Sequence, residues 1–315
     1  MIDMEPYSLD GKRVWVAGHK GMVGSALCRR LQDENCEILT ASKSELDLRD
    51  QAAVRRWISS NKPDLVFVAA ATVGGIVAND SMPAQFLYDN LMIEANVIHA
   101  AYEAGVEKLV FLGSSCIYPR LADQPMTESA LLTGPLEETN QWYAVAKIAG
   151  IKLCQAYRKQ YGCNYISAMP TNLYGTEDNF DLETSHVVPA LMAKMHTGKI
   201  DGAPAVTVWG TGKPKRELLF VDDCADALVH LAKTYAGAEH VNVGTGEDLS
   251  IAEIAETVAK VVGFEGALQF DTSRPDGTPR KLLDTAKLAG LGWRYRTSLQ
   301  DGLAATYEWY LSQRR

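Results

Sequence analysis

A tyrosine and a lysine at helical spacing could exchange a proton with a carbonyl oxygen. Tyr143 and Lys147 lie four residues apart in the helical pattern from Trp142 to Tyr157, so both face one side of that helix. The pKa of a phenol must fall from ~10 toward neutrality, roughly three units, for efficient proton transfer. A cation about 4 Å away contributes on that order. We therefore expect Lys147 to lower the pKa of Tyr143, and Ser114 to hydrogen-bond the carbonyl.

A glycine-rich turn precedes these residues, at the place where a dinucleotide would bind. The apolar run Arg13–Ala17 predicts a buried strand, and Ser25–Leu31 has a helical pattern. Between them, Gly18 and Gly21 allow a tight turn and close approach to a pyrophosphate at the helix N-terminus. Gly24 allows the helix to pack close to the strand. Strand, glycine turn and helix together favour a dinucleotide-binding unit.

Alternating strand and helix patterns continue after this unit. Further short strands are predicted at 37–40, 65–69 and 108–112, with helical stretches between them, notably 84–104. This order predicts an α/β fold: a Rossmann-type, doubly wound parallel sheet with a smaller mixed α/β substrate lobe. We expect the NADP-binding domain at 1–174 with a returning segment at about 217–245. The substrate lobe is expected at about 175–216 and 246–315, including a helix opened by the capping box 250–253.

The residues after the second strand favour NADP over NAD. An acid at the end of this strand would bind the ribose hydroxyls and repel a 2′-phosphate. The stretch from Thr40 to Ser44 has no acid, and it includes Ala41, Ser42 and Lys43. Lys20 adds a second ammonium group from the glycine turn, which suits a phosphate monoester. Asp47 and Leu48 follow where this fold usually contacts the adenine edge.

Composition and charge narrow the class of protein further. The 315 residues carry a formal net charge of −8, which argues against a nucleic-acid or membrane-surface partner. The six cysteines are scattered without a C-x-x-C pair, so we expect neither disulfides nor a structural metal. We see no signal peptide between Met1 and Lys12 and no apolar span long enough for a membrane, so a cytoplasmic location is expected.

Four longer motifs resemble those of the extended short-chain dehydrogenase/reductase family, in the branch that epimerises and reduces GDP-sugars. They are Gly18–Ser25, Val73–Asn79, Leu112–Pro119 and Pro170–Gly175, and the resemblance runs from about Arg13 to Tyr310. It implies an NADP-dependent epimerase-reductase. The implied reaction converts GDP-4-keto-6-deoxy-D-mannose to GDP-L-fucose by C3 and C5 epimerisation followed by reduction of the C4 ketone. The resemblance also implies a homodimer joined through helices next to the Tyr143 helix.

The resemblance implies roles for further residues. Cys116, two residues past Ser114, would be the epimerising base, and His186 the acid. The implied cofactor contacts are Gly18, His19, Lys20, Gly21, Met22, Val23, Gly24, Ala41, Ser42, Lys43, Asp47, Leu48, Ala70, Leu112, Gly113, Ser115, Lys147, Pro170, Asn172, Leu173 and His186. The implied contacts with the GDP moiety are Lys194, Trp209, Arg216, Asp276 and Lys281.

Two alternatives stay open at the level of sequence. Related reductases act on a GDP-4-keto-3,6-dideoxy sugar and epimerise only C5, as in colitose synthesis. A chain of this type could also be a non-catalytic NADP-binding regulator, although Ser114, Tyr143, Lys147, Cys116 and His186 are all present.

Overall fold

The computed structural model describes residues 6–181, 185–274 and 276–314. Residues 1–5, which form part of the segment in which we expect no signal peptide, lie outside the described residues. The first half of the chain contains β1 (Arg13–Ala17), α1 (Met22–Leu31), β2 (Glu37–Leu39), α2 (Gln51–Asn61), β3 (Leu65–Val68), α3 (Ile76–Ser81), α4 (Pro83–Glu103), β4 (Lys108–Leu112), η1 (Ser115–Ile117), η2 (Glu128–Ala130) and α5 (Gln141–Tyr161).

The second half begins with two strands that continue directly from α5. Its elements are β5 (Asn164–Pro170), β6 (Asn172–Tyr174), α6 (Val187–Ile200), β7 (Ala205–Trp209), β8 (Lys215–Arg216), β9 (Leu218–Phe220), α7 (Val221–Thr234), β10 (Val241–Val243), β11 (Leu249–Ser250), α8 (Ile251–Val262), β12 (Ala267–Asp271), β13 (Arg280–Lys281), α9 (Ala286–Gly290) and α10 (Leu299–Ser312).

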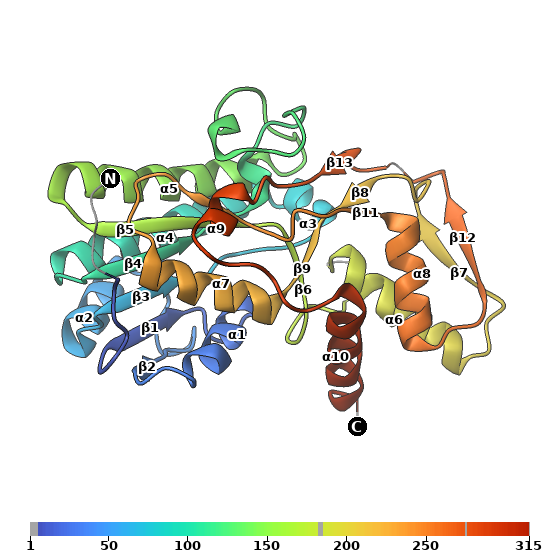
Figure 1. Ribbon diagram of the computed structural model, residues 1–315, viewed down its shortest axis with the longest axis horizontal. Coiled ribbons are helices and arrows are strands. Elements are labelled where there is room, and N and C mark those ends of the chain that lie inside the picture. Colours follow the sequence, from blue (N-terminus) through green and yellow to red (C-terminus); the bar gives the residue numbers. More distant parts are fainter. Residues whose placement is uncertain (1–5, 182–184, 275, 315) are drawn as a thin grey trace.

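A six-stranded parallel sheet, in the order β10-β5-β4-β3-β1-β2, forms the centre of the larger part (Figure 1). Alternate residues of β1 pack on opposite faces, as the two-residue period of a strand requires. Val14 and Val16 pack in a cluster with α1 and α7, whereas Trp15 and Ala17 pack in a second cluster with α2, α4 and α5. The sheet is therefore covered on both faces, and the expected doubly wound fold is confirmed.

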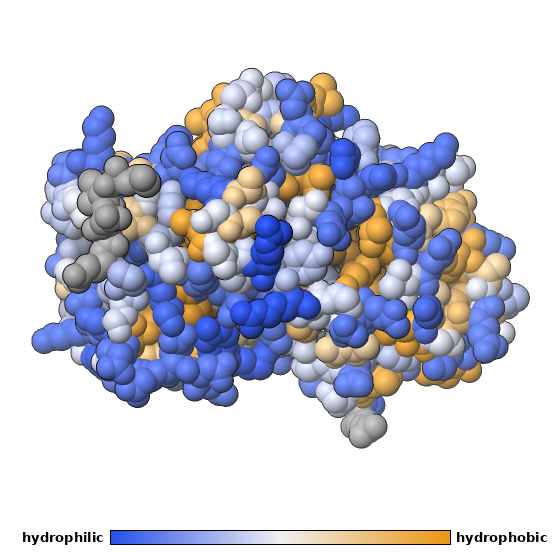
Figure 2. Space-filling view, in the orientation of Figure 1, coloured by the Kyte–Doolittle hydropathy of each residue, from blue (hydrophilic) through white to orange (hydrophobic). Residues whose placement is uncertain are grey.

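A third apolar cluster lies at the other end of the molecule. It joins α6, α8 and α10 with the two-stranded sheet β7-β12, through residues such as Met192, Val206 and Ile254. Figure 1 shows these elements beside the large sheet rather than against its faces. The surface in that view is mainly hydrophilic, with apolar residues gathered over the α6 and α8 end (Figure 2). The proposed boundaries between a cofactor and a substrate lobe stay a prediction.

The glycine turn closes tightly between β1 and α1. Gly18 has φ +94°, and a Cβ atom on it would lie 2.6 Å from the Ala70 amide nitrogen. A Cβ atom on Gly24 would lie 2.0 Å from the Gly18 carbonyl oxygen, so α1 can approach the turn only with glycine there. Ala70 follows β3, which pairs with β1, and the turn thus rests against the next strand's end.

The elements expected from sequence agree with the structure apart from their ends. The strands at 13–17 and 108–112 have the expected bounds, and β2 and β3 each end one residue earlier than expected. The capping box is present: the Glu253 amide donates to Ser250 Oγ, and the Ser250 amide donates to Glu253 Oε2. The helices α6, α7 and α10 were not predicted individually from the sequence. Their apolar residues are spread around the helix in α6, which hides the usual periodicity.

Several features bear on the class of protein. None of the helices in the described part of the chain is long and apolar enough to cross a membrane. Each of the six cysteines has a free thiol. Within residues 6–181, 185–274 and 276–314, no three His, Cys, Asp or Glu side chains form a group that could hold a metal ion.

We predict that Gly24→Ala destabilises the protein, because its new methyl group meets backbone rather than a movable side chain. The expected loss is about 1–3 kcal/mol in the free energy of unfolding, measured by urea denaturation. Gly21→Ala is the matched control, since its Cβ atom meets the Gly18 carbonyl oxygen at an ordinary 3.6 Å. Equal stability of the two variants would contradict the steric account of the turn.

Candidate functional site

Four site segments begin where parallel strands end. The glycine turn follows β1, Ala70 follows β3, Gly113–Cys116 follow β4, and Asn172 and Leu173 follow β5. Because parallel strands end at the same edge of a sheet, these segments are neighbours in space. The turn leaves the α1 N-terminus uncovered by side chains: a Cβ atom on Gly21 would meet nothing closer than Gly18. These free amide groups fit a pyrophosphate.

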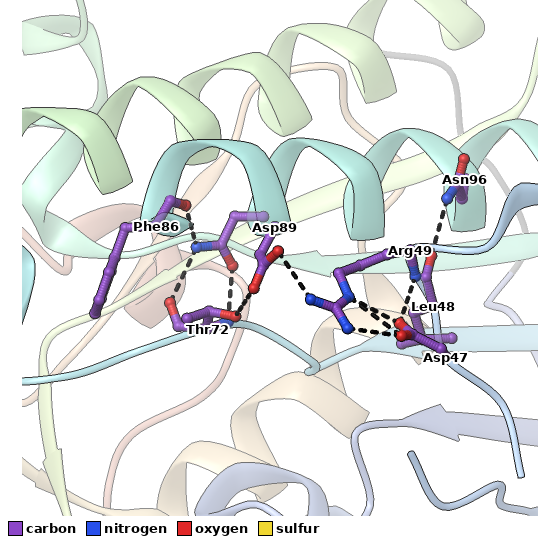
Figure 3. Close-up of polar contacts among 8 residues, drawn as sticks. Asp47, Leu48, Arg49, Thr72, Phe86, Asp89 and Asn96 are labelled. Carbon is purple, nitrogen blue, oxygen red and sulfur yellow. Dashed lines mark hydrogen bonds and ion pairs between the residues drawn. The ribbon is translucent and has the colours of Figure 1, made fainter. Parts of the chain in front are cut away.

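The segment expected to contact adenine is held by a polar network on α4 (Figure 3). Arg49 forms ion pairs with Asp47 and with the buried Asp89, at 2.7 and 3.1 Å. Asn96 donates a hydrogen bond to the Leu48 carbonyl oxygen at 2.9 Å. The hydrogen bonds from Arg49 lower the pKa of Asp47 to about 2, so this carboxylate is ionised at neutral pH. Asp47 and Leu48 are thus fixed in place from one side.

The segment expected to bind the 2′-phosphate also contains a carboxylate, Glu45, that was not expected at this site from the sequence. Glu45 Oε2 accepts hydrogen bonds from the Ser42 amide and hydroxyl, at 2.7 and 2.6 Å. The hydrogen bonds to Ser42, and secondarily the charge of Lys20, lower the pKa of Glu45. Lys20 and Lys43 are exposed. Of the two lysines expected to bind phosphate, Lys20 is therefore exposed in the glycine turn and Lys43 is exposed after β2, while Glu45 is hydrogen-bonded to Ser42.

Ser114 and Cys116 lie on the short helix η1 after β4. Ser114 is the N-cap, and its hydroxyl accepts a hydrogen bond from the Cys116 amide at 3.4 Å. Cys116 is buried, and burial raises the pKa of its thiol, while the positive charge of Lys281 is the largest influence lowering it. The turn presents hydroxyl and thiol on one surface, next to α5.

Tyr143 and Lys147 share one face of α5, as their spacing predicts, but Lys147 does not act on Tyr143 alone. Lys147 Nζ lies 2.9 Å from Glu94 Oε1, and 5.7 Å from the centre of the Tyr143 ring. Burial raises the pKa of Tyr143 well above its ordinary value, and negative charge on Cys116 and Glu94 raises it further. Burial therefore outweighs the expected lowering of this pKa by Lys147, whose ammonium group is paired with Glu94.

Lys281 lies close to Cys116 as well as to Arg216, another of the expected GDP contacts. Its strand β13 pairs with β8, and Lys281 lines a small cavity together with Cys116. Desolvation lowers the pKa of His186, and the charge of Lys281 lowers it further. The charge of this lysine therefore favours the thiolate of Cys116 and makes the imidazolium of His186 a stronger acid. His186 itself is the N-cap of α6.

The remaining expected GDP contacts form a group around one exposed indole ring. Lys194 Nζ lies 4.7 Å from the centre of the Trp209 ring, and Arg274 lies 5.0 Å from it. Asp276 accepts hydrogen bonds from the Thr211 amide and hydroxyl, at 2.8 and 2.7 Å. Arg216 donates to the Thr278 carbonyl oxygen at 2.6 Å. The Trp209 ring, together with the two cations beside it, forms a surface suited to binding a purine base.

Besides Glu45, two residues near the site, Arg274 and Glu94, were not expected from the sequence. Arg274 begins the Arg-Pro-Asp motif that also contains Asp276, and this position could have identified it as a candidate GDP contact. Glu94 lies in the middle of an apolar helix, where a buried carboxylate is expensive unless paired, and no pattern linked it to Lys147 some fifty residues later. The contact between α4 and α5 creates that pair.

Comparisons with known proteins agree with this geometry. The model of the NAD dependent epimerase/dehydratase family matches residues 14–244. A GDP-L-fucose synthase from Sinorhizobium fredii is 60% identical over 98% of both chains, and GDP-L-fucose synthase 1 from Arabidopsis thaliana is 59% identical over 98% of this chain and 97% of its own. A GDP-L-colitose synthase from Yersinia pseudotuberculosis is 36% identical over 96% of this chain and 99% of its own.

Among solved structures, a GDP-L-fucose synthetase from Naegleria fowleri bound to NADP superposes with a TM-score of 0.91. It is 28% identical and covers all of this chain and 98% of its own.

We predict that Lys281→Met slows alkylation of Cys116 by iodoacetamide severalfold at pH 7–8. Removing the positive charge raises the pKa of the thiol, so less thiolate is present. Mass spectrometry of the Cys116 peptide measures the rate against pH. Lys215→Met is the matched control, because Lys215 is exposed on the neighbouring strand β8. Identical pH profiles for the Lys281 variant and the parent protein would show that Lys281 has no influence on the thiol.

Proposed function

Because the chain belongs to the NAD dependent epimerase/dehydratase family, we propose that it converts GDP-4-keto-6-deoxy-D-mannose to GDP-L-fucose. It epimerises C3 and C5 and then reduces the C4 ketone with NADPH. The observation that carries this proposal is the full-length similarity to GDP-L-fucose synthases at 59–60% identity. The chain also has a cysteine, a tyrosine and a lysine at the end of β4 and on α5, which suit both chemistries.

NADP(H) fits the residues at the strand ends and supplies the hydride for C4. The glycine turn and the free amide groups of α1 bind its pyrophosphate, and Lys20 and Lys43 bind the 2′-phosphate. Asp47 and Leu48, held by Arg49 and Asn96, border the adenine. The remaining contacts that the family resemblance implies, from Ala70 to Leu173, line the edge of the sheet between them.

Epimerisation uses the acidity of hydrogens alpha to the C4 ketone. Cys116, as thiolate, removes the proton from C3 or C5, and His186 returns a proton to the opposite face. Ser114 and Tyr143 donate hydrogen bonds to the oxygen of the enolate that forms between the two steps. Lys281 assists the base, because its positive charge lowers the pKa of Cys116.

Reduction uses the same oxygen. As C4 receives the hydride, Tyr143 transfers its phenolic proton to O4, and Ser114 keeps that oxygen in place. The raised pKa of Tyr143 keeps the phenol protonated at neutral pH, which is the form that this step requires. Lys147 stabilises the phenolate left behind, since it lies on the same helix face.

The nucleotide part of the substrate lies between α6, β7 and β8. Trp209, whose ring is contacted by Lys194 and Arg274, stacks on guanine. Asp276, which accepts a hydrogen bond from Thr211, lies next to the guanine ring. Arg216 holds the diphosphate, for which its planar fork is suited. Lys281, the Cα partner of Arg216 across the strand pair, then lies where the sugar begins.

The two alternatives have less support. The colitose-type relative is 36% identical, whereas the fucose-type relatives reach 60%. A non-catalytic regulator would have no need of the proton-transfer groups that meet at η1 and α5. We also propose a cytoplasmic location, which the scattered cysteines favour, and no nucleic-acid partner, in line with the net charge of −8.

We further propose that two copies form a homodimer through α4 and α5. These helices pack on each other, and each carries large apolar side chains that are exposed in one chain. Tyr88 on α4 is 62% exposed, and Trp142 and Val145, one turn apart on α5, are 41% and 43% exposed. Such a patch is typical of a subunit interface.

We predict that the purified protein consumes NADPH with GDP-4-keto-6-deoxy-D-mannose, and that the product formed in D2O carries deuterium at C3 and C5. Cys116→Ser should slow deuterium incorporation at least about a hundredfold while leaving the Kd of NADPH unchanged. Cys163→Ser, at a cysteine away from η1, is the control. Wild-type inactivity with this sugar would overturn the proposed function, and normal exchange in Cys116→Ser would overturn the base assignment.

We predict that the double variant Tyr88→Glu/Val145→Glu is monomeric, because it places charges in the apolar patch. Sedimentation velocity gives the mass of the wild type and the variant. The matched control is Ile200→Glu, at a residue that is 69% exposed on α6 and outside the patch. A monomeric wild type, or a dimeric double variant, would remove the case for this interface.

A further inference from the structure

We propose that Glu94 is a positioning residue that holds the ammonium group of Lys147 and moderates its effect on Tyr143. This inference rests on the proposed function, in which Tyr143 gives its proton to the substrate oxygen. None of the roles described above uses Glu94. The residue lies on α4, outside the segments at the strand ends, and contacts the site through Lys147.

The geometry of the pair is specific. Glu94 Oε1 lies 2.9 Å from Lys147 Nζ, and both side chains are only 2% exposed. The Lys147 ammonium lies 4.8 Å from the centre of the Phe111 ring on β4. Gly150, one turn along α5, has no side chain in the space that Glu94 and Phe111 occupy. A Cβ atom there would lie 2.8 Å from Glu94 Oε2 and 2.3 Å from Phe111. A side chain of any size at 150 would displace the carboxylate.

The arrangement is poorly explained by stability. Apart from the ion pair, neither carboxylate oxygen of Glu94 has a hydrogen-bond partner among the described residues. Buried polar atoms in a core built for stability are normally satisfied, and a buried ion pair gives little or no net stabilisation over apolar side chains. Burial raises the pKa of Glu94, and the positive charge of Lys147 opposes this effect. The carboxylate therefore depends on Lys147 for its charge.

The charges around Tyr143 show what the pair does. Glu94 faces it from α4, Cys116 from η1, and Lys147 from its own helix, while Lys281 on β13 faces Cys116. Glu94 and Cys116 raise the pKa of Tyr143. Without Glu94, the positive charge of Lys147 would lower the pKa of the Tyr143 phenol. The phenol would then lose the proton that is needed at O4. Glu94 holds the Lys147 ammonium group near Tyr143, and its negative charge weakens the effect of that ammonium group on the phenol.

Glu94→Gln tests the inference, because it keeps the shape of the side chain and removes the charge. The phenol must be protonated for reduction, so kcat falls as pH rises through the pKa of Tyr143. Without the carboxylate this basic limb moves to lower pH, and kcat on the limb drops roughly tenfold more than in the wild type. Glu103→Gln is the control: it lies on the same helix in an exposed ion pair with Arg55.

A second measurement does not require turnover. The absorbance of the NADP⁺-bound enzyme near 295 nm is titrated with and without Tyr143→Phe, and the difference isolates this phenol from the other twelve of the 13 tyrosines. The midpoint should fall in Glu94→Gln. If the wild type proves inactive on the proposed sugar, the proposed function fails, while this titration still decides the role of Glu94.

Glu94→Asp covers the case in which Glu94→Gln does not fold. It keeps the charge but withdraws the carboxylate by one methylene, so both readouts should shift in the same direction by less. A folded Glu94→Gln whose basic limb and titration midpoint match those of the wild type would overturn the proposal. Unshifted readouts in Glu94→Asp would overturn it where the glutamine variant is unfolded.

Discussion

The parallel pairing of β1, β3, β4 and β5 brings the ends of four strands to one edge of the sheet. The glycine turn, Ala70, the turn with Ser114 and Cys116, and Asn172 with Leu173 each follow one of these strands. The pairing depends on close packing at a few points, such as the approach of Gly18 to Ala70 and of Gly24 to Gly18. Small side chains there are a condition for the site, because the strand ends could not otherwise come together.

A second constraint is the burial of charged groups near this edge. Glu94 and Lys147 are both buried, and Lys281 lies in a small cavity with Cys116. In surroundings of low dielectric, one charge changes the protonation of its neighbours far more than it would in water. The structure places a compensating carboxylate beside the lysine nearest Tyr143, and a second lysine beside Cys116. Burial raises the pKa of both proton-transfer groups, but only for Cys116 does a neighbouring lysine oppose that rise.

Much of the first half of the fold could be predicted from the sequence, because buried parallel strands are short apolar runs and the glycine turn is a local pattern. The positions of Ser114, Tyr143 and Lys147 follow from the ends of β4 and the period of α5. The charged groups that surround Tyr143 and Cys116 could not be predicted in the same way. Glu94 meets Lys147, and Lys281 meets Cys116, only through contacts between distant segments. The assignment of Lys281 to the nucleotide came from a motif, whereas strand pairing decides which cavity it lines.

The pairing of β8 with β13 has a consequence for how a ligand is chosen. Arg216 and Lys281 are direct neighbours across these strands, and Glu217 next to them accepts hydrogen bonds from the Gly246 and Leu283 amides. The buried carboxylate of Glu217 thus ties the two strands to the surrounding loops as one rigid unit. In the proposed function, a substrate whose diphosphate is bound by Arg216 would therefore place its sugar at a fixed distance from the Cys116 thiol. Selection among substrates would then depend on the nucleotide diphosphate as well as on the sugar.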